Sequence, residues 1–397
     1  MCHVVGQAIE RAIERRQFLA GLGAASTLVL GSPASAKEME EQRKRINASQ
    51  AEASQFNTRL ILLGTAGGPV FWPGTNRHGI ASAVAVGDAL YLVDCGAGAG
   101  RRLQEAQGPS TNGIGVLRDV RALFFTHLHS DHIVDYPALT LFGIFDGSHA
   151  KVPLKVFGPG RRNEMEPVFS PAGAAPHDLP VVNPENPTPG TKDMAGYLYQ
   201  AFATDINDRI RDNHRPDPST MIDVHDIELP EIPGFESPNK TPEPEMAPFK
   251  VFEDDRVRVS ATLVNHFPVW PAFAFRFDTD DGSIVFSGDT AVSENLIRLA
   301  KGADILVHEV IVADWVRSMF PQPRSENDDA ILNHLLSAHT AVEDVGTVAA
   351  RAEVSTLVLS HIVPGNASNE DLAPAQKGFE GKLVIGEDLM QLGVGRR

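Results

Sequence analysis

Short apolar runs separated by polar turns recur along most of the chain, and this pattern predicts many short strands with helices between them. Strands are expected at 59–64, 81–86, 89–94, 120–126, 154–158, 257–266, 272–278, 283–287, 305–309 and 356–360. Helices are expected at 99–106, 136–145, 293–300 and 341–350. The sequence therefore predicts one mixed α/β domain at about 58–397, with two runs of strands that each have helices.

A stretch rich in Pro, Asn, Asp and Glu interrupts this rhythm at about 160–248. One helix is expected inside it, at 194–212, because apolar residues recur there every four positions. These residues are Leu198, Phe202, Ile206 and Ile210. The stripe can pack against the core, or it can belong to a cap over a functional site. Residues 230–248 are expected to form an irregular loop.

The first 36 residues have the pattern of an export signal. Arg15 and Arg16 precede a moderately apolar segment, which ends in the small-residue sequence Ala34-Ser35-Ala36. This resembles a twin-arginine signal peptide with cleavage after Ala36, and the alternative is an amphipathic N-terminal helix. The apolar segment is too short for a membrane span. We expect export by the twin-arginine machinery to the periplasm or the medium, and a polar tether or helix at 37–57.

The composition adds an acidic balance, with 35 Lys and Arg against 51 Asp and Glu and a net charge of −16. Removal of the leader takes away three arginines and two glutamates, which leaves a net charge of −17. A field of this sign repels polyanions and argues against a nucleic-acid partner. It does not exclude a small anionic substrate at a pair of dications. Of the two cysteines, Cys2 lies in the leader, so the mature chain would have no internal disulfide.

The densest group of metal-binding residue types lies directly after the apolar run at 120–125. Side chains two residues apart on an extended strand point to the same side, so His127 and His129 can bind one metal ion together. Asp131 and His132 lie in the following turn or helix start, and are offset enough to hold a second ion. Nitrogen and carboxylate ligands of this kind suit zinc.

Most of the other residues of these types end later apolar runs. They are Asp94, His266, Asp289, His308 with Glu309, His339 and His361. Because of the order of these residues and the HxHxDH run, the chain resembles the metallo-β-lactamase superfamily. Within it, the resemblance is to the branch of ribonuclease Z and the zinc-dependent alkyl and aryl sulfatases. The resemblance extends from about Arg59 to the C-terminus. It implies an αββα sandwich of two mixed sheets with metals at one edge.

The resemblance also implies two divalent metal ions, zinc first, although manganese and iron tolerate the same ligands. The first ion would be held by His127, His129 and His266. The second would be held by Asp131, His132 and His361, and Asp289 would bridge the two. Such a pair, roughly 3.5–4 Å apart, would hold a bridging hydroxide as the nucleophile. Asp94 would orient the HxHxDH loop from behind.

His339 resembles the mobile-loop histidine of ribonuclease Z that protonates the leaving group, and Glu309 resembles the glutamate that orients it. A carboxylate partner fixes the tautomer of a histidine and raises its pKa. Asp131, His339 and Glu309 are therefore the catalytic candidates. A second interpretation makes His339 a polar residue at a helix start. His308 receives no role, and the remaining histidines are interpreted as surface or structural, namely His78, His149, His177, His214, His225 and His334.

Substrate contacts are expected from two places. Phe267 and Trp270 flank His266 and can form a wall for an aryl substrate, or can be core residues. In the branch named above, an insertion near 160–248 shapes substrate access, which makes candidates of Phe202, Asn207 and Arg209. Gly64, Gly67 and Gly68 are expected to form a tight loop near the metals.

The first functional hypothesis is an exported dinuclear-metal hydrolase of small anionic esters, either aryl or alkyl sulfates or phosphodiesters. Asp289 favours it, since several true β-lactamases of the superfamily have Cys at the bridging place. The alternatives are a ribonuclease Z-like tRNA 3′-processing endonuclease, and a lactonase or organophosphate hydrolase. A non-catalytic metal-binding protein comes last, because all seven expected ligands are present. A homodimer is compatible with this branch.

Overall fold

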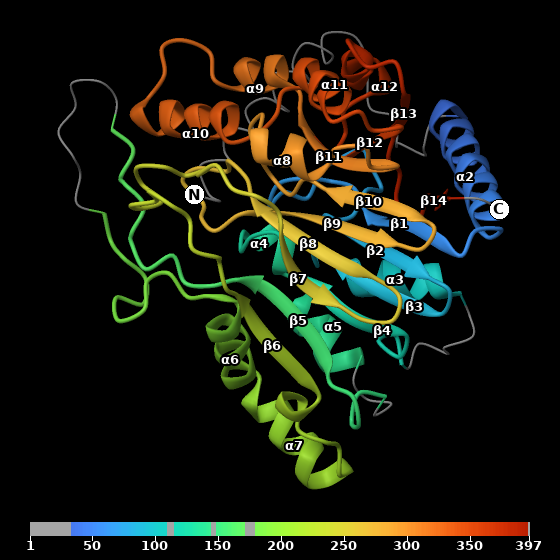
Figure 1. The fold of residues 1–397 in the computed structure, drawn as a ribbon, viewed down its shortest axis with the longest axis vertical. Helices are drawn as coiled ribbons and strands as arrows, with labels where there is room; N and C mark the ends of the chain where they lie inside the picture. Colours follow the sequence, from blue (N-terminus) through green and yellow to red (C-terminus); the bar gives the residue numbers. More distant parts are fainter. Residues whose placement is uncertain (1–32, 109–114, 144–147, 171–178, 396–397) are drawn as a thin grey trace, which may run out of the picture.

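Two seven-stranded β-sheets lie face to face in the computed structural model (Figure 1), which describes residues 33–108, 115–143, 148–170 and 179–395. The first sheet contains β1 (Thr58–Gly64), β2 (Ala81–Val86), β3 (Ala89–Val93), β4 (Val120–Phe124), β5 (Leu154–Pro159), β6 (Ile222–Ile227) and β14 (Gln391–Val394). The second contains β7 (Phe249–Glu253), β8 (Arg258–Leu263), β9 (Phe273–Thr279), β10 (Gly282–Phe286), β11 (Ile305–Ile311), β12 (Thr356–Val363) and β13 (Lys382–Ile385). The strand orders are β14-β1-β2-β3-β4-β5-β6 and β13-β12-β11-β10-β9-β8-β7.

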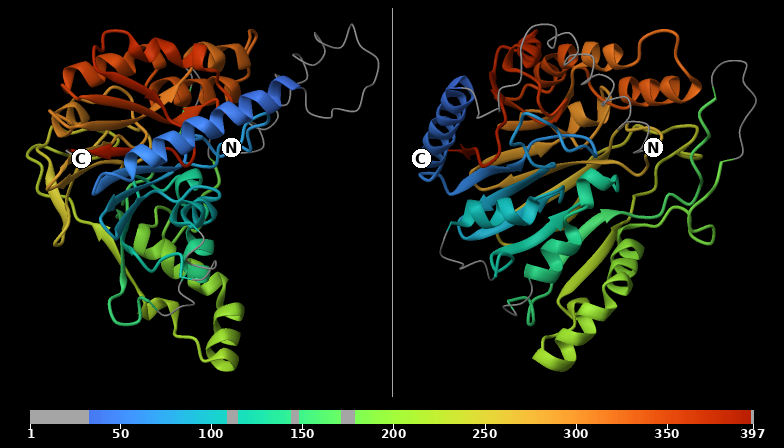
Figure 2. Two further views of the ribbon diagram at one scale, coloured as in Figure 1. Left: turned by 90° about the vertical axis from the view of Figure 1, so that its right-hand side faces the viewer. Right: turned by 180° about the vertical axis from the view of Figure 1, so that it is seen from behind.

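Helices cover the outer faces of both sheets (Figures 1 and 2). On the side of the first sheet they are α3 (Ala99–Gln107), α4 (Ser130–Ile133), α5 (Tyr136–Gly143), α6 (Thr191–Ala201) and α7 (Ala203–Asn213). On the side of the second they are α8 (Glu294–Leu299), α9 (Ala313–Met319), α10 (Glu326–Ser337), α11 (Val342–Arg351) and α12 (Asn369–Leu372). Within the described ranges, none of the helices combines the length and the apolar character that a membrane crossing requires.

The core between the sheets follows from the alternation of side chains along each strand. In β1, Leu60 and Leu62 face the second sheet, while Ile61 and Leu63 face the outer helices. Phe124 of β4 packs edge-on against Phe277 of β9, with ring centroids 5.3 Å apart. Both faces of the first sheet are thus buried, which explains the nearly continuous apolar runs of its central strands. The predicted αββα sandwich is confirmed.

The insertion at 160–248 differs from the expectation in two respects, and the first is that it contributes the edge strand β6 to the first sheet. Its sequence, Ile-Asp-Val-His-Asp-Ile, has three polar residues, and only its two end residues are fully buried. A pattern of this kind is typical of an edge strand, and in the sequence alone it cannot be distinguished from that of a loop. The single helix expected at 194–212 is divided into α6 and α7 at Phe202.

The segment expected to be a tether or helix at 37–57 is mostly helical. It belongs to α2 (Pro33–Ala53), which lies along the edge strand β14 (Figure 2). The Arg45 guanidinium donates to the Glu387 carboxylate, and the Gln50 amide donates to the Leu389 carbonyl. Residues 1–32 of the predicted export signal lie outside the described residues, and the expected cleavage after Ala36 falls at the start of α2.

Candidate metal centre

The candidate site residues meet at one edge of the two sheets because of the strand directions. Strands β3 and β4 run parallel in the first sheet, and β10, β11 and β12 run parallel in the second. Their carboxyl ends therefore lie together. The HxHxDH run follows β4, Asp289 follows β10, and His361 lies near the end of β12.

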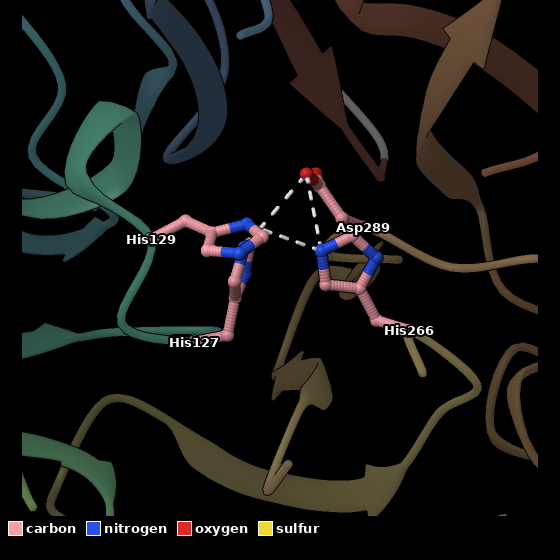
Figure 3. A group of neighbouring side chains, drawn as sticks. All are labelled: His127, His129, His266 and Asp289. Carbon is pink, nitrogen blue, oxygen red and sulfur yellow. Dashed lines mark hydrogen bonds and ion pairs between the residues drawn. The ribbon is translucent and has the colours of Figure 1, made fainter. Parts of the chain in front are cut away.

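The first cluster consists of His127, His129, His266 and Asp289, whose side chains point toward one another (Figure 3). One ligand atom from each lies within 4.8 Å of all the others. His129 Nδ1 is 3.3 Å from His266 Nε2. A tetrahedral zinc ion with bonds of about 2.0–2.1 Å separates two nitrogen ligands by a similar distance. The spacing therefore fits a shared metal ion.

The second cluster consists of Asp131, His132 and His361, all buried. His361 Nε2 is 3.2 Å and His132 Nε2 is 3.6 Å from Asp131 Oδ2. Burial lowers the pKa of His132, but the carboxylates of Asp289, Asp94 and Asp131 outweigh it and raise that pKa well above its usual value. The excess of negative charge around one imidazole is what a dication would neutralise.

Asp289 lies between the two clusters. Its Oδ2 is 3.8 Å from His127 Nε2 in the first cluster and 3.2 Å from His361 Nε2 in the second. Its Oδ1 is buried and has no hydrogen-bond partner among the described residues. A buried carboxylate oxygen without a partner is costly. This arrangement fits a carboxylate that bridges two metal ions.

Hydrogen bonds set the tautomers that metal binding needs. His266 Nδ1 donates to the Ala338 carbonyl at 2.8 Å, and His132 Nδ1 donates to the Asp94 carboxylate at 2.9 Å. In both rings Nδ1 therefore carries a proton and Nε2 is directed at the cluster, where in His132 a metal ion would take the place of a second proton. Burial also lowers the pKa of His127 and of His266 well below the usual value. Neutral imidazoles are the form that binds metal.

Asp94 supports the HxHxDH loop, as the resemblance implies. Besides its bond to His132, its carboxylate accepts hydrogen bonds from the backbone N–H and the hydroxyl of Thr126. Asp94 and His361 both have positive φ angles, 60° and 46°, which residues other than glycine rarely adopt. Such conformations cluster at functional sites, where the surrounding structure holds them.

The glycine loop after β1 lies against the second cluster, as predicted. The N–H of Gly68 donates to Asp131 Oδ2 at 2.9 Å. A Cβ on Gly67 would lie 2.4 Å from Nδ1 of His361, far inside van der Waals contact. Gly67 is therefore required for His361 to occupy its position.

His339 and Glu309 form a buried pair beside the clusters. His339 Nδ1 donates to the Glu309 carboxylate at 3.0 Å, and lies 4.0 Å from Asp289 Oδ2. Burial lowers the pKa of His339, but Glu309 and Asp289 outweigh it and raise that pKa to about 9. Glu309 also accepts the Thr290 N–H, which fixes its orientation. His339 can therefore carry a proton on Nε2 at neutral pH.

Two histidines that were assigned no metal or catalytic role also reach this region. His308 is buried, donates from Nδ1 to the Glu309 carbonyl, and has its pKa lowered to about 4 by burial. His334 was interpreted as surface or structural, and the structure corrects this, because it lies with His266 and His339. His334 lies on α10, a helix that was not predicted, and no sequence motif indicates a role for this histidine.

The structure places the expected pocket residues in different parts of the molecule. Phe267 directly follows His266, whereas Trp270 stacks on Phe235 with ring centroids 5.6 Å apart and packs against the core. The insertion candidates are Phe202, Asn207 and Arg209. They lie on or next to α7, which leads into the amino end of β6, whereas the clusters lie at the carboxyl end of the parallel strand β4 (Figure 1). The α7 helix therefore does not cap the clusters.

The chain is similar to known proteins over most of its length. A family model described as the metallo-beta-lactamase superfamily matches residues 76–199. Ribonuclease Z of Mycolicibacterium paratuberculosis is 31% identical over 338 residues, which cover 84% of this chain and 98% of that protein. The chain belongs to the metallo-beta-lactamase superfamily. Ribonuclease Z of Mycobacterium marinum is 30% identical over 342 residues, which cover 85% of this chain and 99% of that protein.

Solved structures of the superfamily share the fold. The metallo-beta-lactamase fold protein YhfI from Bacillus subtilis has a TM-score of 0.52 and 16% identity. The match covers 84% of this chain and 98% of YhfI. Human tRNase Z, short form, has a TM-score of 0.51 and 17% identity. The match covers 85% of this chain and 100% of human tRNase Z. The metallo-beta-lactamase fold implies divalent metal binding, and the His and Asp clusters of this chain can hold metal.

Proposed function

We propose that this member of the metallo-beta-lactamase superfamily hydrolyses phosphodiester bonds at a dinuclear metal centre, in the manner of ribonuclease Z. The observation that carries the proposal is the His339–Glu309 pair, which lies 4.0 Å from the carboxylate between the two clusters. When bound, the metal ions would activate water and neutralise charge on the substrate oxygens. The first would be held by His127, His129 and His266, the second by Asp131, His132 and His361, with Asp289 shared.

The protein supplies the proton for the leaving group. Because His339 Nδ1 donates to Glu309, the acidic proton is on Nε2, the atom that can face a substrate. An alkoxide leaving group needs such a proton, whereas the aryl oxide released from an aryl phosphate or an aryl sulfate departs more readily without it. The pair therefore favours a substrate with a sugar hydroxyl as the leaving group.

RNA is the first substrate class under this proposal, because the relatives that match almost their full length are ribonuclease Z proteins. This reverses the order expected from the sequence. A small anionic ester, including an aryl or alkyl sulfate, is the second candidate, and the net charge of −16 favours it. A lactone or organophosphate would use the same residues.

Export by the twin-arginine route belongs to the second candidate and is proposed with it. Its test is fractionation of the native host, followed by N-terminal sequencing of the protein. A periplasmic or secreted chain that begins at Lys37 supports export. A chain that keeps its N-terminus and stays in the cytoplasm contradicts it.

The activity test is a parallel assay on the full chain with measured metal content. The substrates are a 3′-extended precursor tRNA, bis(para-nitrophenyl) phosphate, an aryl sulfate and a lactone, with Asp289→Asn as the control protein. Turnover of both phosphodiesters by the wild type alone supports the proposal. Turnover of the sulfate or the lactone with no turnover of either phosphodiester contradicts it.

A further inference from the structure

We propose that His334 contacts the substrate phosphate directly, as a second imidazole beside His339. This inference rests on the proposed phosphodiester hydrolysis. The ring centroid of His334 lies 6.0 Å from that of His129, 5.7 Å from that of His266 and 5.9 Å from that of His339. His334 thus faces two residues of the first cluster and the proposed acid at once.

His334 lies on the open side of the first cluster. His127 and His266 are completely buried, whereas His129 and His334 keep partial exposure. A substrate that approaches the cluster from solvent therefore meets these two rings. Among the residues that the structure describes, no side chain or backbone group forms a hydrogen bond with the His334 ring. Its N–H is available for an anionic oxygen.

The packing of α10 fixes this position. Four apolar side chains of the helix pack against a buried cluster that includes Val316 and Phe320. These side chains are Ile331, Leu332, Leu335 and Leu336. The aromatic pair Trp72 and Trp315, whose ring centroids lie 5.5 Å apart, packs against the same cluster. Trp72 also donates from Nε1 to the carbonyl of Gly67, the residue that lies against His361. The helix that carries His334 is therefore tied to the loop beside the second cluster.

The end of α10 concentrates three functional groups within six residues. The Ala338 N–H donates to the His334 carbonyl, the Ala338 carbonyl accepts from His266, and His339 follows directly. A purely structural histidine in this place would bond its ring to the protein. A further metal ion held by His266, His334 and His339 would need His266 Nε2, which faces Asp289, and His339 Nε2, which carries the proposed acidic proton. Contact with substrate requires only what the ring already has, which is partial exposure and an N–H without a hydrogen-bond partner among the described residues.

The experiment compares His334→Ala and His334→Gln with Asn333→Ala, which changes the exposed neighbour on the same helix. Turnover of bis(para-nitrophenyl) phosphate and of a dinucleotide is measured, together with metals per chain and the calorimetric affinity for inorganic phosphate. We expect His334→Ala to lower kcat/KM on both substrates by about 10- to 100-fold, the range for a hydrogen bond to a charged group. Phosphate affinity should fall in parallel, while metal content and Asn333→Ala stay at wild-type values.

His334→Gln should recover part of both losses, because its amide N–H can still donate. Wild-type kcat/KM and phosphate affinity in His334→Ala would overturn the inference. Loss of a metal ion in that variant would overturn it as well, since His334 would then be a ligand. If the wild type binds phosphate but turns over neither diester, the proposed function fails. Weaker phosphate binding by His334→Ala would still support the contact.

Discussion

His266 donates a hydrogen bond from Nδ1 to the carbonyl oxygen of Ala338 over 2.8 Å, and Ala338 is the residue immediately before His339. The ring that faces the first cluster through Nε2 therefore also holds the backbone that carries the proposed acid. A metal ion bound at the first cluster would fix His266 and, through this bond, the position of His339. Metal binding and acid positioning are thus linked by one side chain.

Metal removal is the first prediction. Without metal, buried polar atoms of His127, His132 and Asp289 have no hydrogen-bond partner among the described residues. Metal that binds only the folded state stabilises it by about 4 kcal/mol when the free ion is 1,000 times Kd. Thermal unfolding of the chelated protein should therefore occur well below that of the zinc-loaded protein. Magnesium at the same concentration is the control, and equal melting temperatures with and without zinc would contradict the account.

Replacement of His339 should affect substrates according to their leaving groups. General acid catalysis contributes about 10²- to 10⁴-fold. His339→Ala should lose this factor on a dinucleotide, whose leaving group is an alkoxide, and much less on bis(para-nitrophenyl) phosphate. The readout is the slope of log kcat/KM against leaving-group pKa, which should become steeper in the variant. An unchanged slope would mean that His339 does not act as the acid.

The pH profile on the dinucleotide should depend on Glu309. Burial lowers the pKa of His339, but Glu309 and Asp289 outweigh it and raise that pKa to about 9, so the protonated ring is present at neutral pH and is lost as the pH rises through that value. Glu309→Gln removes the negative charge but keeps the shape, so the alkaline fall in kcat/KM should move to lower pH. Kinetics between pH 6 and 10 measure this shift. A fall at unchanged or higher pH would contradict the role of Glu309.

Gly67→Ala should disturb the second cluster selectively. The added methyl group would lie 2.4 Å from His361 Nδ1, so the ring must move away from Asp131 and Asp289. We expect about a 10- to 100-fold loss of affinity for one of two metal ions, comparable to the loss of an outer-shell partner. Gly196→Ala is the matched control, because a Cβ there meets no atom within 4 Å. Two tightly bound metal ions in Gly67→Ala would show that the loop can adjust.

The strands were predictable because the central ones are buried on both faces and appear as continuous apolar runs. The resemblance to the superfamily then implied the αββα sandwich. The same resemblance implied that His127, His129, His266, Asp289 and His361 would come together. The sequence did not predict α10 or His334. The first turn of α10 is polar, and the buried cluster against which the helix packs includes residues distant in sequence such as Val363. Contacts of that kind become visible only in the folded chain.

Asp289 provides the most direct test of the dinuclear centre, because its Oδ2 lies within 4.0 Å of nitrogen atoms from both clusters. The measurement is metal content per chain and phosphodiester turnover of Asp289→Ala, with circular dichroism to establish folding. The account predicts fewer than two metal ions per chain and a loss of kcat of more than about 100-fold. A folded Asp289→Ala that keeps two metal ions and wild-type turnover would contradict the bridging role and the dinuclear mechanism.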